Sequence, residues 1–145
     1  MSQGKPAAPQ QPGSSKDEDA IAFAQGIFDL ARNGGATLLA PLLEAGVPVD
    51  MCTSEGDTLL LLATRNGHPE TVRLLLARGA APDRQDGQNR TSLMLAAEAN
   101  RTDVLDLLLA AGADAALTDQ EGHTALDLAR THRADATARR LEQLG

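Results

Sequence analysis

The chain has 145 residues, a formal net charge of −7, 42% hydrophobic residues and only 1% aromatic residues. This length suits one domain, and its leucines and alanines favour helices, because both are strong helix formers while strand-forming residues are scarce. An acidic chain without aromatic residues lacks the basic patch and the stacking platforms of nucleic-acid binders, so we expect no nucleic-acid partner.

Residues 1–14 are predicted to form a disordered tail. They are mostly Pro, Gln, Gly, Ser and Ala, which bury too little apolar surface to offset the entropy of ordering. This stretch has no apolar core of a secretory signal, and no run in the chain approaches the 18 apolar residues of a membrane span. The single cysteine, Cys52, can form no internal disulfide. We therefore expect a cytoplasmic protein that does not bind membranes, and export through other signals stays open.

Residues 15–145 are expected to form the folded domain, and they repeat with a period of 33 residues. Several independent sets of positions share this step. The sets include Gly46, Gly79, Gly112 and Gly145; Leu42, Leu75, Leu108 and Leu141; and Thr58, Thr91 and Thr124. A fixed period of this length is typical of stacked repeat architectures.

One repeat is predicted to contain two short helices and a turn. Thr58 is placed to start the first helix, and Gly67 to end it by adopting positive φ. Pro69 suits the first turn of the second helix, which Gly79 ends. The polar stretch "APDRQDGQN" then leads to the next threonine. Two antiparallel helices of about ten residues would not be stable alone in water.

Stacking of the repeats explains the segment "TLLLLATRN", which is too apolar for a helix with one exposed face. We expect the first helix of each repeat to lie between the first helices of its neighbours. Its leucines then belong to a core that adjacent repeats share.

These segments resemble the ankyrin repeat. The family pattern of Thr-Pro-Leu-His, paired Ala, Gly-His, Val-x-x-Leu-Leu and Gly-Ala-Asp is similar to "EGDTLLLLATRNGHPETVRLLLARGAAPD", "GQNRTSLMLAAEANRTDVLDLLLAAGADAA" and "EGHTALDLARTHRADATARRLEQLG". "IFDLARNGGATLLAPLLEAGVPVD" resembles a degenerate first repeat that serves as the N-terminal cap. The resemblance covers about residues 17–145. It implies an all-α solenoid of about four repeats, at about 17–52, 53–85, 86–118 and 119–145, with the last one as the C-terminal cap.

The chain departs from the family pattern at several positions. The histidine of the family tetrapeptide is replaced by Leu61, Met94 and Asp127. We expect packing of Leu61 and Met94 to substitute for its hydrogen bonds. Asn89 and Asn100 stand at expected glycine positions, which is tolerable because asparagine enters the left-handed region more readily than most residues. Arg133 is less suited to the third such position.

No enzyme site is predicted, because no Ser-His-Asp grouping, phosphate-binding loop or paired-carboxylate cleft emerges. Cys52 is expected to be a passive, partly exposed residue, and His68, at the Gly-His position, to tie the turn between its helices. His123 and Asp127 lie at i and i+4, with His132 nearby, so a metal- or small-ligand-binding protein is the alternative. No cofactor is expected under the leading hypothesis.

The leading hypothesis is a monomeric adaptor or regulator that binds an unknown partner protein. The resemblance implies binding through the hairpin tips and the concave side of the first helices. The matching positions are Ser54, Glu55, Asp57, Arg65, Asn66, Gly87, Gln88, Arg90, Glu98, Ala99, Gln120, Glu121, His123, Thr131 and His132. Among them, Arg65 and Arg90 beside the acidic residues would give charge complementarity. An excess of Arg over Lys indicates a bacterial source, and an exported effector that binds a host protein stays a further alternative.

Overall fold

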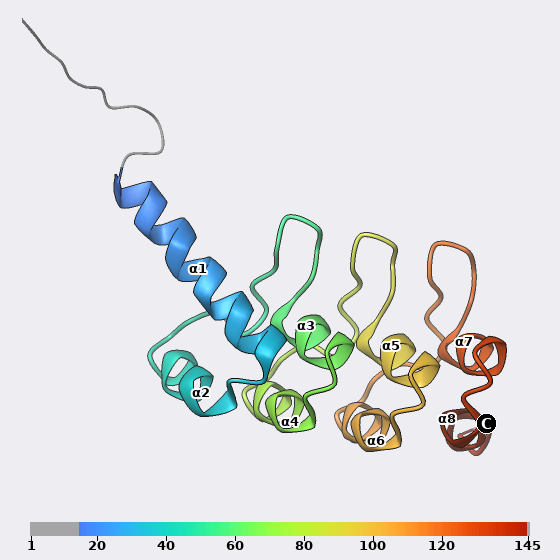
Figure 1. The fold of residues 1–145 in the computed structure, drawn as a ribbon. Helices are drawn as coiled ribbons and strands as arrows, with labels where there is room; N and C mark the ends of the chain where they lie inside the picture. The colour runs from blue at the N-terminus through green and yellow to red at the C-terminus, as the bar shows by residue number, and fades with distance from the viewer. Residues whose placement is uncertain (1–14, 145) are drawn as a thin grey trace, which may run out of the picture.

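The computed structural model describes residues 15–144 and, in this part of the chain, contains helices arranged in pairs. The helices are α1 (Ser15–Asn33), α2 (Ala36–Glu44), α3 (Leu59–Arg65), α4 (Pro69–Ala77), α5 (Ser92–Glu98), α6 (Thr102–Ala110), α7 (Ala125–Thr131) and α8 (Asp135–Glu142). The first helices of the pairs form one row and the second helices another, and three hairpin loops leave the same side of the stack (Figure 1). This is the all-α repeat solenoid that the sequence predicts. The predicted tail at residues 1–14 lies outside the described residues.

The repeated threonines begin the first helices, as the sequence predicts. The side-chain oxygen of Thr58 accepts a hydrogen bond from the backbone N–H of Leu61 at 3.1 Å. Thr91 and Thr124 make the same bond at the start of α5 and α7, each at 3.2 Å. Each bond satisfies one of the N–H groups that a helix start leaves without a partner.

The left-handed positions are confirmed. Asn89, Asn100 and Arg133 are the residues other than glycine with positive φ in the described chain, at 62°, 59° and 57°. Asn100 also contributes its side chain, because its Oδ1 accepts the backbone N–H groups of Ala136 and Thr137 at 3.1 Å. It thereby connects one repeat to the first turn of α8 in the next.

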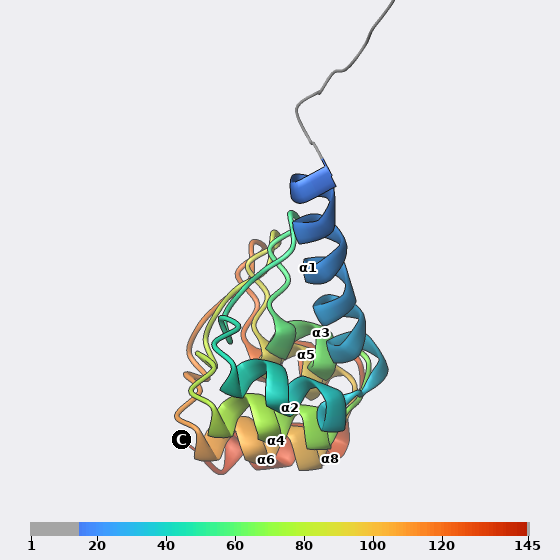
Figure 2. The same ribbon diagram turned by 90° about the vertical axis from the view of Figure 1, so that its left-hand side faces the viewer.

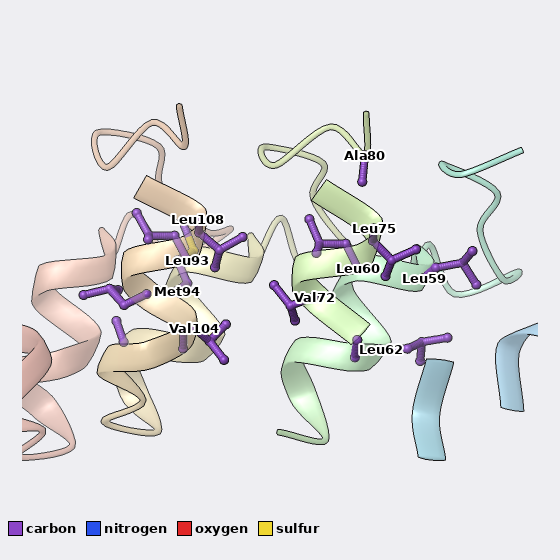
Figure 3. Close-up of a cluster of buried hydrophobic side chains, with 14 of the residues drawn as sticks. Leu59, Leu60, Leu62, Val72, Leu75, Ala80, Leu93, Met94, Val104 and Leu108 are labelled. Carbon is purple, nitrogen blue, oxygen red and sulfur yellow. The ribbon is translucent and has the colours of Figure 1, made fainter. Parts of the chain in front are cut away.

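The core runs through the whole stack without a break. Residues 59–64 of α3 are all at most 5% exposed, because α3 contacts α1 and α5 on its flanks and α4 behind it. Figure 3 shows the side chains of Leu59 and Leu62 on one side of this helix and that of Leu60 on another. On the outer row, Leu75 and Leu108 are fully buried. A nearly all-apolar helix is therefore possible here because neighbouring repeats surround it.

The positions of the family histidine are filled in two ways. Leu61 is fully buried, so packing replaces hydrogen bonding there. Met94 is also buried, but the expectation was wrong for it, because its Sδ accepts the N–H of Thr91 at 3.5 Å and forms a capping box at the start of α5. Asp127 is exposed, and its Oδ2 accepts the N–H of Thr124 at 3.1 Å. With the bond from Asp127 N–H to Thr124 this forms a capping box at the start of α7.

Helix α1 differs from the prediction, because it has 19 residues rather than about ten. Its C-terminal half packs on the stack, with Ile27, Phe28 and Ala31 buried. Its N-terminal half extends beyond α3 on the side of the hairpins (Figures 1 and 2). There Ile21 and Phe23 are 56% and 55% exposed. No breaker interrupts residues 17–25, so the helix continues past the end of the repeat pattern.

Candidate protein-interaction surface

The three hairpins have the same backbone structure and are joined to one another. In each, the N–H of its first residue bonds the carbonyl four residues later: Thr53 to Asp57, Asp86 to Arg90, and Asp119 to His123, at 2.9–3.0 Å. Between hairpins, Gly87 N–H donates to the carbonyl of Glu55 at 3.1 Å, and Gln120 N–H to that of Gln88 at 3.0 Å. These bonds fix the hairpin tips as one continuous row.

Asp86 organises the middle hairpin, and sequence reasoning missed it. Its Oδ1 accepts the N–H groups of Gln88 and Arg90 at 2.8 and 2.9 Å. Its Oδ2 accepts Arg65 Nη2 at 3.0 Å and Arg90 Nε at 3.2 Å. Burial alone would raise the pKa of this carboxyl, but the backbone hydrogen bonds and the charge of Arg90 outweigh it and hold the pKa below its usual value. Asp86 is therefore an anchoring carboxylate.

Asp119 has the same role in the third hairpin. Its Oδ1 accepts the N–H groups of Glu121 and His123, each at 2.9 Å. The hydrogen bond from His123 is the main cause that lowers the pKa of Asp119. At the equivalent place of the first hairpin, Thr53 Oγ1 accepts the N–H of Asp57 at 3.1 Å. The recurrence of Asp86 and Asp119 33 residues apart was the signal available in the sequence.

Both predicted arginines are paired within the surface. Arg65 Nη1 lies 2.8 Å from Asp57 Oδ1 while its Nη2 bonds Asp86, and Arg90 shares the same Asp86 oxygen. Their side chains remain about one-third exposed. Their charges are balanced by aspartates of this chain, so they are less available to a partner than the sequence suggested.

Most of the predicted partner-binding residues lie together in what we call the inner groove. It consists of two concavities between successive hairpins. The first is lined by Ser54, Glu55, Asp57, Arg65, Asp86, Gly87, Gln88 and Arg90. The second is lined by Gln88, Arg90, Glu98, Asp119, Gln120, Glu121, Leu128 and His132. Because Gln88 and Arg90 of the middle hairpin line both, the two concavities lie next to each other on either side of that hairpin.

The other predicted residues lie outside these linings. Asn66 ends α3, where its Nδ2 donates to the carbonyl of Leu62 at 2.8 Å. Thr131 is exposed at the end of α7, and Ala99 is exposed just after α5. His123 lies in the third hairpin, where its Nδ1 is 3.8 Å from both Asp119 Oδ2 and Glu121 Oε1.

The structure does not favour the alternative metal set of His123, Asp127 and His132. Asp127 belongs to the capping box of α7, and His132 Nδ1 lies 2.9 Å from the carbonyl of Leu128. Within residues 15–144, His123 is grouped instead with Asp119 and Glu121, whose ligand atoms lie within 4.8 Å of one another. All three come from one exposed hairpin.

A further cleft lies between α1 and the first hairpin, and we call it the α1 cleft. Its helical side combines the apolar Ile21, Ala24 and Phe28 with the polar Gln25 and Arg32, while its hairpin side is polar. The hairpin side comprises Cys52, Thr53, Ser54 and Glu55. Ser54 and Glu55 also line the first concavity, so the α1 cleft adjoins the inner groove at the first hairpin. Sequence reasoning missed this cleft, because the length of α1 creates it.

Comparison with known proteins identifies the repeats. The sequence model of a family described as ankyrin repeats, in three copies, matches residues 27–119. The chain is also similar to a protein of Pseudomonas aeruginosa that is named as an ankyrin repeat protein, with 41% identity over 53 residues. That match covers 37% of this chain and 31% of the relative, so the chain spans about a third of the relative's length. In the described part of the chain, no helix is long and apolar enough to cross a membrane.

Proposed function

Because the chain belongs to the ankyrin repeat family, whose repeats generally mediate protein–protein interaction, we propose that it is a non-enzymatic adaptor or regulator. It binds a segment of a partner protein in the inner groove. The fold by itself does not identify the partner, so the proposal depends on the groove.

One observation carries the proposal: the two concavities of the groove follow each other along three joined hairpins, and their walls differ from repeat to repeat. The framework residues return every 33 positions, whereas Ser54, Gly87 and Gln120 occupy the same place in successive hairpins. A surface built in this way presents different side chains along one rigid scaffold. The bonds between hairpins fix the scaffold in advance, so binding loses little conformational entropy.

The contacts of the histidines support a non-enzymatic role. His68 Nε2 lies 2.7 Å from the carbonyl of Arg32, so it ties the loop after α3 to the end of α1 in the preceding repeat. This contact lies between repeats, whereas the sequence suggested one within a repeat. His132 is bonded to the helix that precedes it. Exposed Cys52 is a free thiol, which suits the reducing cytoplasm that we propose as its compartment.

The proposal is tested by filling the groove with bulk rather than charge. The variant Ser54→Trp with Gln88→Trp places two large side chains in the first concavity, where both residues are exposed. The matched control is Arg73→Trp with Ala110→Trp, two exposed positions on the outer helices α4 and α6. Each protein is immobilised and used to capture proteins from a lysate of the organism that encodes it, and circular dichroism verifies that each variant is folded.

We expect the wild type and the control to capture the same proteins, and the groove variant to lose them. If the groove variant captures them at wild-type yield, the inner groove is not the binding surface.

A further inference from the structure

The inner groove carries acidic side chains that this chain does not neutralise. Within the described residues, Glu55 and Glu98 have no Lys, Arg or His nitrogen within 4.0 Å. Glu121 has only the imidazole of His123, at 3.8 Å. One of these carboxylates lies in the first concavity and two lie in the second. They form a row of negative charge along the groove.

The two arginines of the groove do not cancel this charge. Arg65 bonds both Asp57 and Asp86, and Arg90 bonds Asp86. The two positive charges are thus offset by the two negative charges of Asp57 and Asp86, and the unpaired carboxylates determine the sign that a partner meets. Potentials across an interface are complementary, so the groove fits a positively charged segment.

The α1 cleft adds an apolar contact at one end of the same surface. Its helical wall contains Ile21, Ala24 and Phe28 beside Gln25 and Arg32, and Ile21 is 56% exposed. The charge of Arg32 is offset by Asp29, which lies 2.7 Å from it. The cleft meets the groove at Ser54 and Glu55, so an apolar side chain bound there is followed at once by acidic neighbours. Exposed apolar side chains rimmed by polar residues are typical of an interaction site.

We propose that the partner is an extended basic segment of a protein, with one apolar side chain in the α1 cleft and arginine or lysine side chains on Glu55, Glu98 and Glu121. This deepens the proposed function and depends on it. Stacked helices lie about 8–10 Å apart, so the first and third hairpins are separated by about 16–20 Å. Extended chain rises about 3.3 Å per residue, so about five or six residues cover that length.

The test uses fluorescein-labelled synthetic peptides and fluorescence anisotropy. The basic peptide is a leucine followed by four Ser-Arg pairs. One control, the acidic peptide, has glutamate in place of every arginine, and the other has serine in place of the leucine. The groove variant is Glu55→Gln with Glu98→Gln and Glu121→Gln. The matched charge control is Glu70→Gln with Asp103→Asn and Asp135→Asn, exposed acids on the outer helices α4, α6 and α8.

We expect the wild type and the charge control to bind the basic peptide with similar affinity, and not to bind the acidic peptide. The groove variant should bind about tenfold more weakly, because each of three exposed charge pairs contributes about a twofold effect. Ile21→Ser and the peptide without leucine should each weaken binding by about threefold. Together they should weaken it no more than either change alone, because both remove the same contact.

The outcomes separate this inference from the proposed function. If the groove variant and the charge control lose the same affinity, the attraction is general and the basic-segment proposal is wrong. It is also wrong if the acidic peptide binds as well as the basic one. In either case the proposed function survives as long as tryptophans in the groove abolish partner capture. If the variant with those tryptophans still captures the partner, the proposed function is wrong, and the basic-segment proposal, which depends on it, is wrong with it.

Discussion

Arg65 on α3 bonds the carboxylate of Asp86, 21 residues further along the chain, at 3.0 Å. This contact joins the inner helix of one repeat to the hairpin of the next. Asp86 also accepts two backbone N–H groups of its own hairpin. One carboxylate therefore determines both the shape of a hairpin and the position of an arginine in the groove.

We predict that Asp86→Ala lowers the free energy of unfolding by about 1–3 kcal/mol, because it leaves hydrogen-bond donors of the hairpin and a guanidinium group without their acceptor. Urea denaturation measures this change. Glu70→Gln is the control, because Glu70 is exposed and its loss should change stability by less than about 0.5 kcal/mol. Equal stability of the Asp86 variant and the control would contradict the role of Asp86.

Acid unfolding should depend on Asp86. Its pKa in the folded protein lies below the usual value of 3.8, so its contribution to stability is complete above pH 3.8 and is lost as the pH falls through the folded pKa. The stability of Asp86→Asn should therefore fall less steeply below pH 3.8 than that of the wild type. Thermal melts between about pH 5 and 2 test this. Parallel curves for the two proteins would show that the pKa of Asp86 is not lowered by folding.

We predict that Leu75→Ala or Leu108→Ala lowers the free energy of unfolding by about 2–5 kcal/mol, because each side chain is fully buried and its removal leaves a cavity. Against a total of about 5–15 kcal/mol, either change would be severe. Leu38→Ala, at a residue that is 65% exposed, is the control with little expected effect. Chemical denaturation that gives similar values for all three would contradict the packing of the outer helices.

Two residues with the same backbone conformation should respond in opposite directions to glycine. Arg133 has φ of 57°, so Arg133→Gly should relieve strain and raise stability by about 1 kcal/mol. Asn100 has φ of 59°, but Asn100→Gly also removes the acceptor for Ala136 and Thr137. We expect a net loss of about 1 kcal/mol there. Thermal unfolding measures both, and a gain at Asn100 would show that its side-chain bonds are not important.

The sequence predicted the parts of the fold that repeat. Thr58 and its two equivalents begin helices, and Asn89, Asn100 and Arg133 have positive φ. These could be predicted because equivalent positions have the same backbone conformation in every repeat. The length of α1 was not predictable in this way, since its N-terminal half has no counterpart 33 residues later.

The candidate site was predicted only in outline. Positions such as Glu55 and Gln88 were found by register with other repeats, and the structure places them in one groove. The pairing of Arg65 and Arg90 with Asp86 was missed, because it depends on side-chain directions between two repeats rather than on spacing. Thr53 obscured the role of Asp86, because it replaces aspartate in the first hairpin while it accepts a similar hydrogen bond.

The most direct test of the binding surface is an amide NMR spectrum of the ¹⁵N-labelled protein, recorded with and without the unlabelled partner that it captures. The account predicts that the shifted amides belong to hairpin residues 53–57, 86–90 and 119–123 and to the side of α1 that faces the first hairpin. Shifts confined to α2, α4, α6 and α8, with the hairpin amides unchanged, would contradict it.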